Sequence, residues 1–134
     1  MQNTKALLSH KQEGRAMNKK VQWTVFVDIN LKKAVDELLK KPSIKFSQFM
    51  QSVINRFVHL ADRDKLKIIK QAIPEEYSAK GKAYTVTISG HVLSSFTDYM
   101  AGTNLQQKVI LEKIMIDFLS KSQAEQEAIL FATP

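Results

Sequence analysis

The chain has 134 residues, of which 44% are apolar and 25% charged, so it has material for one ordinary domain or for two small units that share a core. It carries a net charge of +7, contains no cysteine and has no apolar run close to the roughly 20 residues of a membrane span. These values exclude disulfide bonds and thiolate metal sites, and they favour a cytoplasmic protein with no membrane partner.

The positive charge is concentrated in the first half of the chain. Residues 1–70 hold 15 Lys or Arg against 6 Asp or Glu, whereas residues 71–134 hold 5 against 7. A basic half favours a polyanionic partner, with nucleic acid ahead of an anionic membrane surface. A well-solvated protein surface is the ordinary alternative.

The first predicted elements are an arm and a strand. Residues 1–20 mix amide, hydroxyl and basic side chains with few apolar ones, which is typical of a flexible basic arm. In residues 23–28 (WTVFVD), apolar side chains occupy every second place, which predicts a strand with one buried face.

Two amphipathic helices are predicted next. Leu31, Val35 and Leu39 share one face of a helix that Asp28 or Asn30 can cap and that Pro42 ends. A second apolar stripe predicts a helix from about residue 45 to about residue 60.

The same pattern returns in the second half of the chain, in one register and without an insertion or a deletion. Residues 84–89 (YTVTIS) repeat the strand, Ser89 replaces Asp28 as the cap, and the apolar stripes of both helices keep their spacing. Gly102, Thr103 and Asn104 are expected to end the first helix of this copy, because Asn104 can take the left-handed conformation that ends a helix. Agreement in one register predicts two related units.

We therefore expect a basic arm at 1–20, a first unit at 21–73, a linker at 74–81 and a second unit at 82–134. Each unit is expected to end in a short third helix. Leu66, Ile69 and Ile73 have helical spacing in the first unit, and Ser122 with Glu125 forms a capping box in the second.

A strand, a helix, a short turn and a longer helix, present twice, resemble the ribbon-helix-helix family of DNA-binding proteins. The likeness is closest in the second copy, where residues 84–89 are followed by Val92, Leu93 and Phe96 and then by Leu105, which is expected to open the second helix. Two units on one chain resemble the tandem members that assist relaxases in plasmid or T-DNA transfer. The resemblance implies a mainly α-helical fold with one two-stranded antiparallel ribbon and a pseudo-twofold arrangement within the chain.

A two-stranded ribbon fits the major groove of DNA, where each base pair displays a distinct pattern of donors, acceptors and thymine methyl. Side chains alternate along a strand, so the expected base contacts are those that face away from the core. They are Gln22, Thr24, Phe26, Ala83, Thr85 and Thr87. Ordinary β-propensity on a solvated face is the alternative explanation for the threonines.

Phe26 departs from the family pattern, because members usually present a polar or basic residue at the middle of the ribbon. An aromatic ring there can pack on thymine methyl groups or can mean that the first strand has lost direct base reading. The two half-sites are therefore expected to differ.

Phosphate contacts are expected at the start of each second helix, where unpaired amides and the helix dipole favour an anion. These positions are Lys45, Phe46, Ser47, Gln106, Gln107 and Lys108. The lysines that flank the strands are further candidates: Lys19, Lys20, Lys80 and Lys82.

Residues for catalysis or metal binding are not grouped in the sequence. His10, His59 and His91 lack metal-site spacing, and Ser89 is better explained as a helix cap than as a nucleophile. The chain has only four glycines and no phosphate-binding glycine loop. We expect no enzyme activity and no cofactor.

The predicted function is sequence-specific binding of double-stranded DNA, as a transcriptional repressor or as an accessory factor in plasmid or conjugal DNA processing. A relaxase or another DNA-processing protein, and further copies of the chain on DNA, are the additional partners considered. The alternative is a protein-interaction or assembly module that retains the fold and docks through Phe26 with Ile129, Leu130 and Phe131. Pairing of the units within one chain or between two chains remains open.

Overall fold

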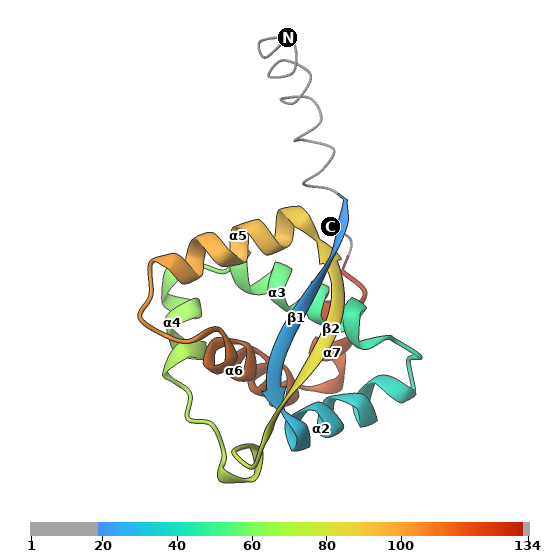
Figure 1. Cartoon of the computed structure of the whole chain (residues 1–134). Coiled ribbons are helices and arrows are strands. Elements are labelled where there is room, and N and C mark those ends of the chain that lie inside the picture. The colour runs from blue at the N-terminus through green and yellow to red at the C-terminus, as the bar shows by residue number, and fades with distance from the viewer. Residues whose placement is uncertain (1–18, 133–134) are drawn as a thin grey trace.

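A computed structural model describes residues 19–132, so almost all of the predicted basic arm lies outside the described residues. The described chain is mainly helical with one two-stranded antiparallel sheet, as expected (Figure 1). Its elements are β1 (Lys20–Asp28), α2 (Ile29–Lys40), α3 (Phe46–His59), α4 (Asp62–Lys70), a 3₁₀ turn (Glu75–Tyr77), β2 (Gly81–Ser89), α5 (Gly90–Ala101), α6 (Gln107–Leu119) and α7 (Gln123–Leu130).

The elements of the second half begin at one constant interval after those of the first. This repeat interval, which separates Lys20 from Gly81, relates β1 to β2, α2 to α5, α3 to α6, and α4 to α7. Short third helices, α4 and α7, are present, but α4 ends at Lys70, before Ile73, which was expected to belong to it. Each strand begins three residues earlier than the alternating pattern predicted.

Local side-chain signals set several helix boundaries. Asp28 caps α2, since its Oδ2 accepts hydrogen bonds from the amides of Asn30 (2.9 Å) and Leu31 (3.0 Å). Ser122 and Glu125 form the predicted capping box of α7.

The end of α5 differs from the prediction for Asn104. Gly102 closes the helix with a bond from its amide to Tyr99 O (3.1 Å), and Thr103 bonds to Met100 O (3.0 Å). These bonds satisfy the last carbonyls without a left-handed residue. Among the described residues, the one non-glycine with positive φ is Ser43, at 56° in the turn after α2. The left-handed conformation predicted for Asn104 was wrong.

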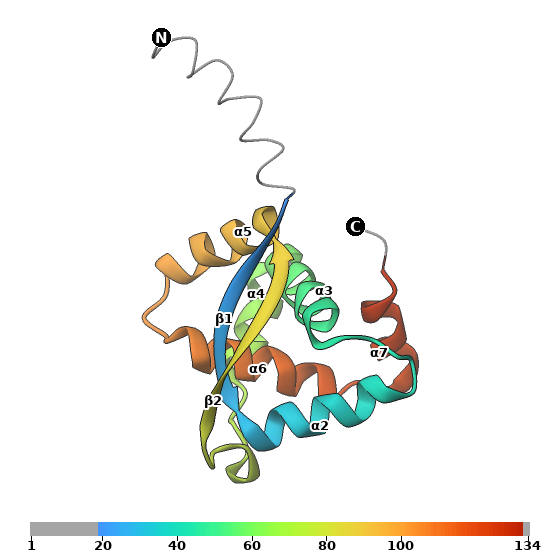
Figure 2. The same ribbon diagram turned by 45° about the vertical axis from the view of Figure 1, so that its right-hand side comes forward.

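The two strands form the ribbon, and its inner face is buried against the helices. Val25, Val27, Val86 and Ile88 are fully buried, as the alternation predicted. Thr24 lies opposite Thr85 at the middle of the register. Two views related by a 45° turn show the ribbon in front of the helices, with its outer face uncovered (Figures 1 and 2).

The two halves of the chain build one core. β2 packs on α3 and β1 on α6, while α4 packs against α6 and α7 against α3. Phe49 of α3 and Phe118 of α6 meet edge to face with ring centroids 5.0 Å apart. Because each third helix covers the second helix of the other half, the buried residues form a single cluster. No helix within residues 19–132 is long and apolar enough to cross a membrane.

Candidate nucleic-acid interface

The six residues predicted to contact bases lie together on the outer face of the ribbon. All six are exposed, and the antiparallel register places them in three directly opposed pairs. These pairs are Gln22 with Thr87, Thr24 with Thr85, and Phe26 with Ala83. Opposed side chains in such a pair are near enough to address the same stretch of a ligand.

The register groups these residues by ribbon end rather than by strand. We call Gln22 and Thr87 the polar end, and Phe26 and Ala83 the apolar end, with the two threonines between them. Sequence alternation assigned one half-site to each strand. The pairing instead places Gln22 beside Thr87 at one end and both apolar side chains at the other.

The ring of Phe26 packs on its own ribbon although it is 52% exposed. A Cβ placed on Gly81 would lie 3.3 Å from Cδ1 of Phe26 and 3.1 Å from Cε of Lys108. The absence of a side chain at Gly81 therefore makes room for the ring and for the lysine stem. This packing gives the exposed ring a partner and holds it on the outer face.

Side chains from α3 bond to the free edge of β2. Ser47 Oγ accepts a hydrogen bond from the Thr87 amide (2.9 Å), and Gln51 Oε1 accepts one from the Ser89 amide (2.6 Å). Edge amides of a sheet need such partners. The hydroxyl of Ser47 thus positions the polar end of the ribbon.

A buried carboxylate of α6 holds the corresponding edge of β1. Glu112 Oε2 accepts bonds from the Asp28 amide (2.7 Å) and from Lys108 Nζ (2.9 Å). Glu112 and Gln51 occupy equivalent positions of the two halves and make the same kind of contact to opposite strands. Since Lys108 faces a carboxylate, its charge is partly offset.

Asp28 ties the apolar end to the linker. Its Oδ1 accepts bonds from the amides of Ala79 (2.8 Å) and Lys80 (3.0 Å), and its Oδ2 caps α2. Burial raises the pKa of this carboxyl, but the four amide hydrogen bonds outweigh burial and hold the pKa below its usual value. Asp28 is therefore an ionised structural group.

The predicted phosphate-contacting helix starts lie where the sequence placed them. α3 begins at Phe46 and α6 at Gln107, and neither Lys45 nor Gln106 caps its helix with a side-chain hydrogen bond. First-turn amides have no partner within their own helix, so they are suited to an anion. The ring of Phe46 packs against Phe49 and Tyr84. The group of Phe46 that can contact a phosphate is therefore its backbone amide and not its side chain.

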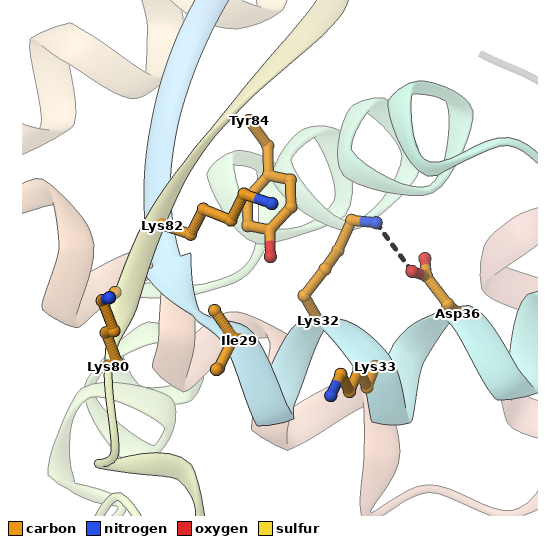
Figure 3. A pocket seen from close by; sticks show the side chains of 8 residues that line it. Ile29, Lys32, Lys33, Asp36, Lys80, Lys82 and Tyr84 are labelled. Atoms are coloured by element: carbon orange, nitrogen blue, oxygen red, sulfur yellow. Dashed lines mark hydrogen bonds and ion pairs between the residues drawn. The ribbon is translucent and has the colours of Figure 1, made fainter.

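A basic hollow of about 580 Å³ lies beside the first residues of β2 (Figure 3). It is lined by four lysines and one aspartate together with Ile29, Gly81 and Tyr84. Lys80 and Lys82 were predicted as phosphate contacts. Lys32 and Lys33 of α2 were missed, because their position beside β2 depends on the packing of the helix against the ribbon.

Lys32 is held in place within this basic hollow. Its Nζ lies 2.7 Å from Asp36 Oδ2, 4.5 Å from the ring centroid of Phe46 and 4.8 Å from that of Tyr84. Lys82 reaches toward the same tyrosine from β2, with Nζ 5.9 Å from the ring centroid (Figure 3). Burial, with the charges of Asp36 and Asp28, raises the pKa of Tyr84, so the ring remains a neutral phenol.

The other half of the chain has no equivalent basic hollow in its sequence. The repeat interval places Leu93 and Ser94 at the positions of Lys32 and Lys33, and Val21 at the position of Lys82. The remaining predicted contacts, Lys19 and Lys20, are exposed near the polar end. Positive charge is therefore unequal along the ribbon.

Residues considered for other chemistry are dispersed. His59 Nδ1 lies 2.8 Å from Asn55 O, and residues 19–132 contain no group of three His, Asp or Glu side chains placed to hold a metal. Leu130 is buried in the core, whereas Phe131 is 59% exposed beside Leu38 in a separate hollow between α2 and α7. Comparisons of the chain with protein-family models, curated proteins and solved structures found no match.

Proposed function

We propose that this chain binds double-stranded DNA sequence-specifically by placing the outer face of its ribbon in the major groove. The observation that carries the proposal is the set of three opposed, exposed residue pairs on a ribbon face that none of the described helices covers. A two-stranded ribbon has the width of the major groove, and its outward side chains then face base edges.

The fold we propose is a tandem ribbon-helix-helix arrangement with pseudo-twofold symmetry inside one chain. Two features support it: the constant repeat interval between element starts, and the opposition of Thr24 to Thr85, which are equivalent positions of the two halves. An axis through this pair places α3 and α6 on opposite sides of the ribbon.

The flanking groups support contact with the phosphate backbone. The starts of α3 and α6 offer unpaired amides on both sides, and the basic hollow adds Lys32, Lys33, Lys80 and Lys82 on one side. The biological role we propose is that of a cytoplasmic repressor or an accessory factor in plasmid or conjugal DNA processing, with a relaxase or a similar DNA-processing protein as partner.

The test begins with selection of bound duplexes from a random pool. A variant with Thr85→Ala and Thr87→Ala is then compared with the native chain on the selected duplex and on random DNA. Each of the two base contacts is worth about 1 kcal/mol, so we expect binding of the selected duplex to weaken roughly 30-fold and binding of random DNA to change little. Ser95→Ala on α5, outside the ribbon, is the matched control for removal of a hydroxyl.

Two outcomes would contradict the proposal. If the selection enriches no sequence, the proposal of sequence-specific binding is contradicted. Equal weakening of binding to both duplexes, or no weakening of either, would contradict the proposal that β2 contacts bases. Binding should also weaken steeply with salt, by about 0.9 in the logarithmic slope for each phosphate contacted, and affinity that is constant between low and moderate salt would contradict the phosphate contacts.

A further inference from the structure

An ion pair joins equivalent positions of the two halves. Arg56 of α3 and Asp117 of α6 are 61 residues apart, and Arg56 Nη1 lies 3.3 Å from Asp117 Oδ2. Their separation is the repeat interval that relates all the paired elements of the chain. A contact between equivalent positions lies where the two halves meet face to face.

Further polar side chains surround this ion pair, which is partly buried. The side chain of Asp117 is 10% exposed and that of Arg56 is 32% exposed. Gln71, which follows α4, donates from Nε2 to Asp117 Oδ1 at 3.3 Å, and Lys121, just after α6, lies 3.7 Å from Oδ2. Asp117 therefore receives two of its three partners from the first half of the chain.

We infer that this ion pair makes each unit select the other kind of unit as its partner. If two first units paired with each other, Arg56 would face a second Arg56. If two second units paired, a mostly buried Asp117 would face a second Asp117. Lys121 would stay with its own Asp117, but Arg56 and Gln71 would be absent.

Selection by charge has a general physical basis. Removing two charges from water offsets much of their attraction, so a half-buried ion pair adds little stability over an apolar pair. Juxtaposed like charges carry the same desolvation cost without the attraction, and such a mismatch is an effective way to reject a wrong partner. The predicted partner surface for each first unit is thus a second unit, whether from its own chain or from another. This inference holds whatever the ribbon binds.

Charge reversal within the full chain tests the contact. We expect Arg56→Asp and Asp117→Arg each to lower the thermal unfolding midpoint by several degrees, and the double variant to recover at least half of that decrease. A double variant that is no more stable than the less stable single variant would overturn the inference.

Exchange between two full chains tests whether the charges at this contact select the partner. The chain with Arg56→Asp holds two aspartates at the contact, and the chain with Asp117→Arg holds two arginines. Unfolded together, mixed one to one and refolded, they are expected to form a two-chain species, with twice the 15.3 kDa of one chain, in which both opposite-charge contacts are restored. Differently tagged chains and light-scattering mass measure this product.

The controls are refolding mixtures of each variant with itself under a second tag, and of the native chain with itself. We expect at least tenfold more mixed-tag species from the complementary variants than from any of these. Equal recovery from complementary and self mixtures would overturn the inference. Because the mixture starts from unfolded chains, a variant that does not fold alone still gives a result.

Discussion

The two ends of the ribbon are built from residues at the same repeat interval in the two halves of the chain, but they carry different chemistry. At the polar end, Gln22 and Thr87 lie on the outer face, and neutral side chains of α3 hold the β2 edge. At the apolar end, Phe26 packs over Gly81, the carboxylates of Asp28 and Glu112 lie behind it, and the basic hollow lies beside it.

Under the proposed DNA binding, this difference predicts a division of work within the outer face of the ribbon. Hydrogen-bonding side chains at the polar end suit discrimination between base pairs, whereas a ring suits contact with thymine methyl groups. Within residues 19–132, the larger cluster of lysines lies beside the apolar end, where it would attract phosphates whatever the sequence. We therefore expect the chain to bind its site in one orientation.

The largest contrast between the ends is expected in stability. Asp28→Ala leaves four amides without their acceptor and should cost about 3 kcal/mol in the free energy of unfolding. Ser89 occupies the equivalent cap position of α5, but its side chain makes no capping hydrogen bond to the helix amides, so the expectation that it caps like Asp28 was wrong and Ser89→Ala should cost less, about 0.5 kcal/mol. Urea unfolding measures both changes in the free energy of unfolding, and equal costs for the two substitutions would contradict the expected difference between the ends.

The same residue gives a pH signature. The folded-state pKa of Asp28 lies below its ordinary value of 3.8, so its contribution is complete above pH 3.8 and is lost as the pH falls through the lower folded value. In acid unfolding curves, Asp28→Asn should therefore show a smaller decrease of stability below pH 3.8 than the native chain.

The next largest effect is expected from charge beside the apolar end. A variant with Lys80→Gln and Lys82→Gln should bind selected and random DNA about tenfold more weakly, because phosphates are present in both, and its salt slope should fall by about 0.9 for each phosphate that it no longer neutralises. Lys67→Gln on α4, whose side chain is 77% exposed, is the matched control. Weakening confined to the selected duplex would assign these lysines to base reading instead.

A smaller effect should follow when the apolar end is given the chemistry of the polar one. Phe26→Thr installs the residue found at the equivalent position, Thr87. We expect repeated selection to return a changed sequence at one end of the site and an unchanged sequence at the other, with an affinity change of about 1 kcal/mol. A selected DNA sequence that changes at both ends, or at neither, would contradict the prediction that Phe26 contacts only one end of the DNA site.

The smallest effect is expected at Glu112. Glu112→Gln copies Gln51 of the other half, keeps an acceptor for the Asp28 amide and removes the carboxylate that faces Lys108. DNA affinity should rise a few-fold at low salt, because Lys108 is then free to face a phosphate, and stability should change by about 1 kcal/mol or less. Unchanged or lower affinity would contradict the placement of Lys108 at the interface.

Much of the architecture was predictable because its information is local and occurs twice. A strand alternation, a cap, a helix stop and two apolar stripes repeat at one interval, and the element starts follow that interval. Strand alternation also identified the outer face, since a side chain two residues further along a strand returns to the same face.

What was missed depends on contacts between elements. The grouping of Phe26 with Ala83 requires the register, which a strand sequence alone does not give. The place of Lys32 beside Tyr84 requires the packing of α2 against β2. The Lys108 to Glu112 pair has the four-residue spacing of a helical ion pair, so it was open to prediction, whereas the bond from Glu112 to the β1 edge was not.

Joining both strands of the ribbon in one chain has a consequence for dilute solutions. A ribbon made from two separate chains falls apart as protein concentration drops, so its active fraction depends on how many copies are present. Here the partner strand is covalently attached, and its local concentration is fixed by the linker. The outer face of the ribbon therefore stays assembled at any copy number, and under the proposed function the occupancy of a DNA site by single chains should follow the first power of protein concentration.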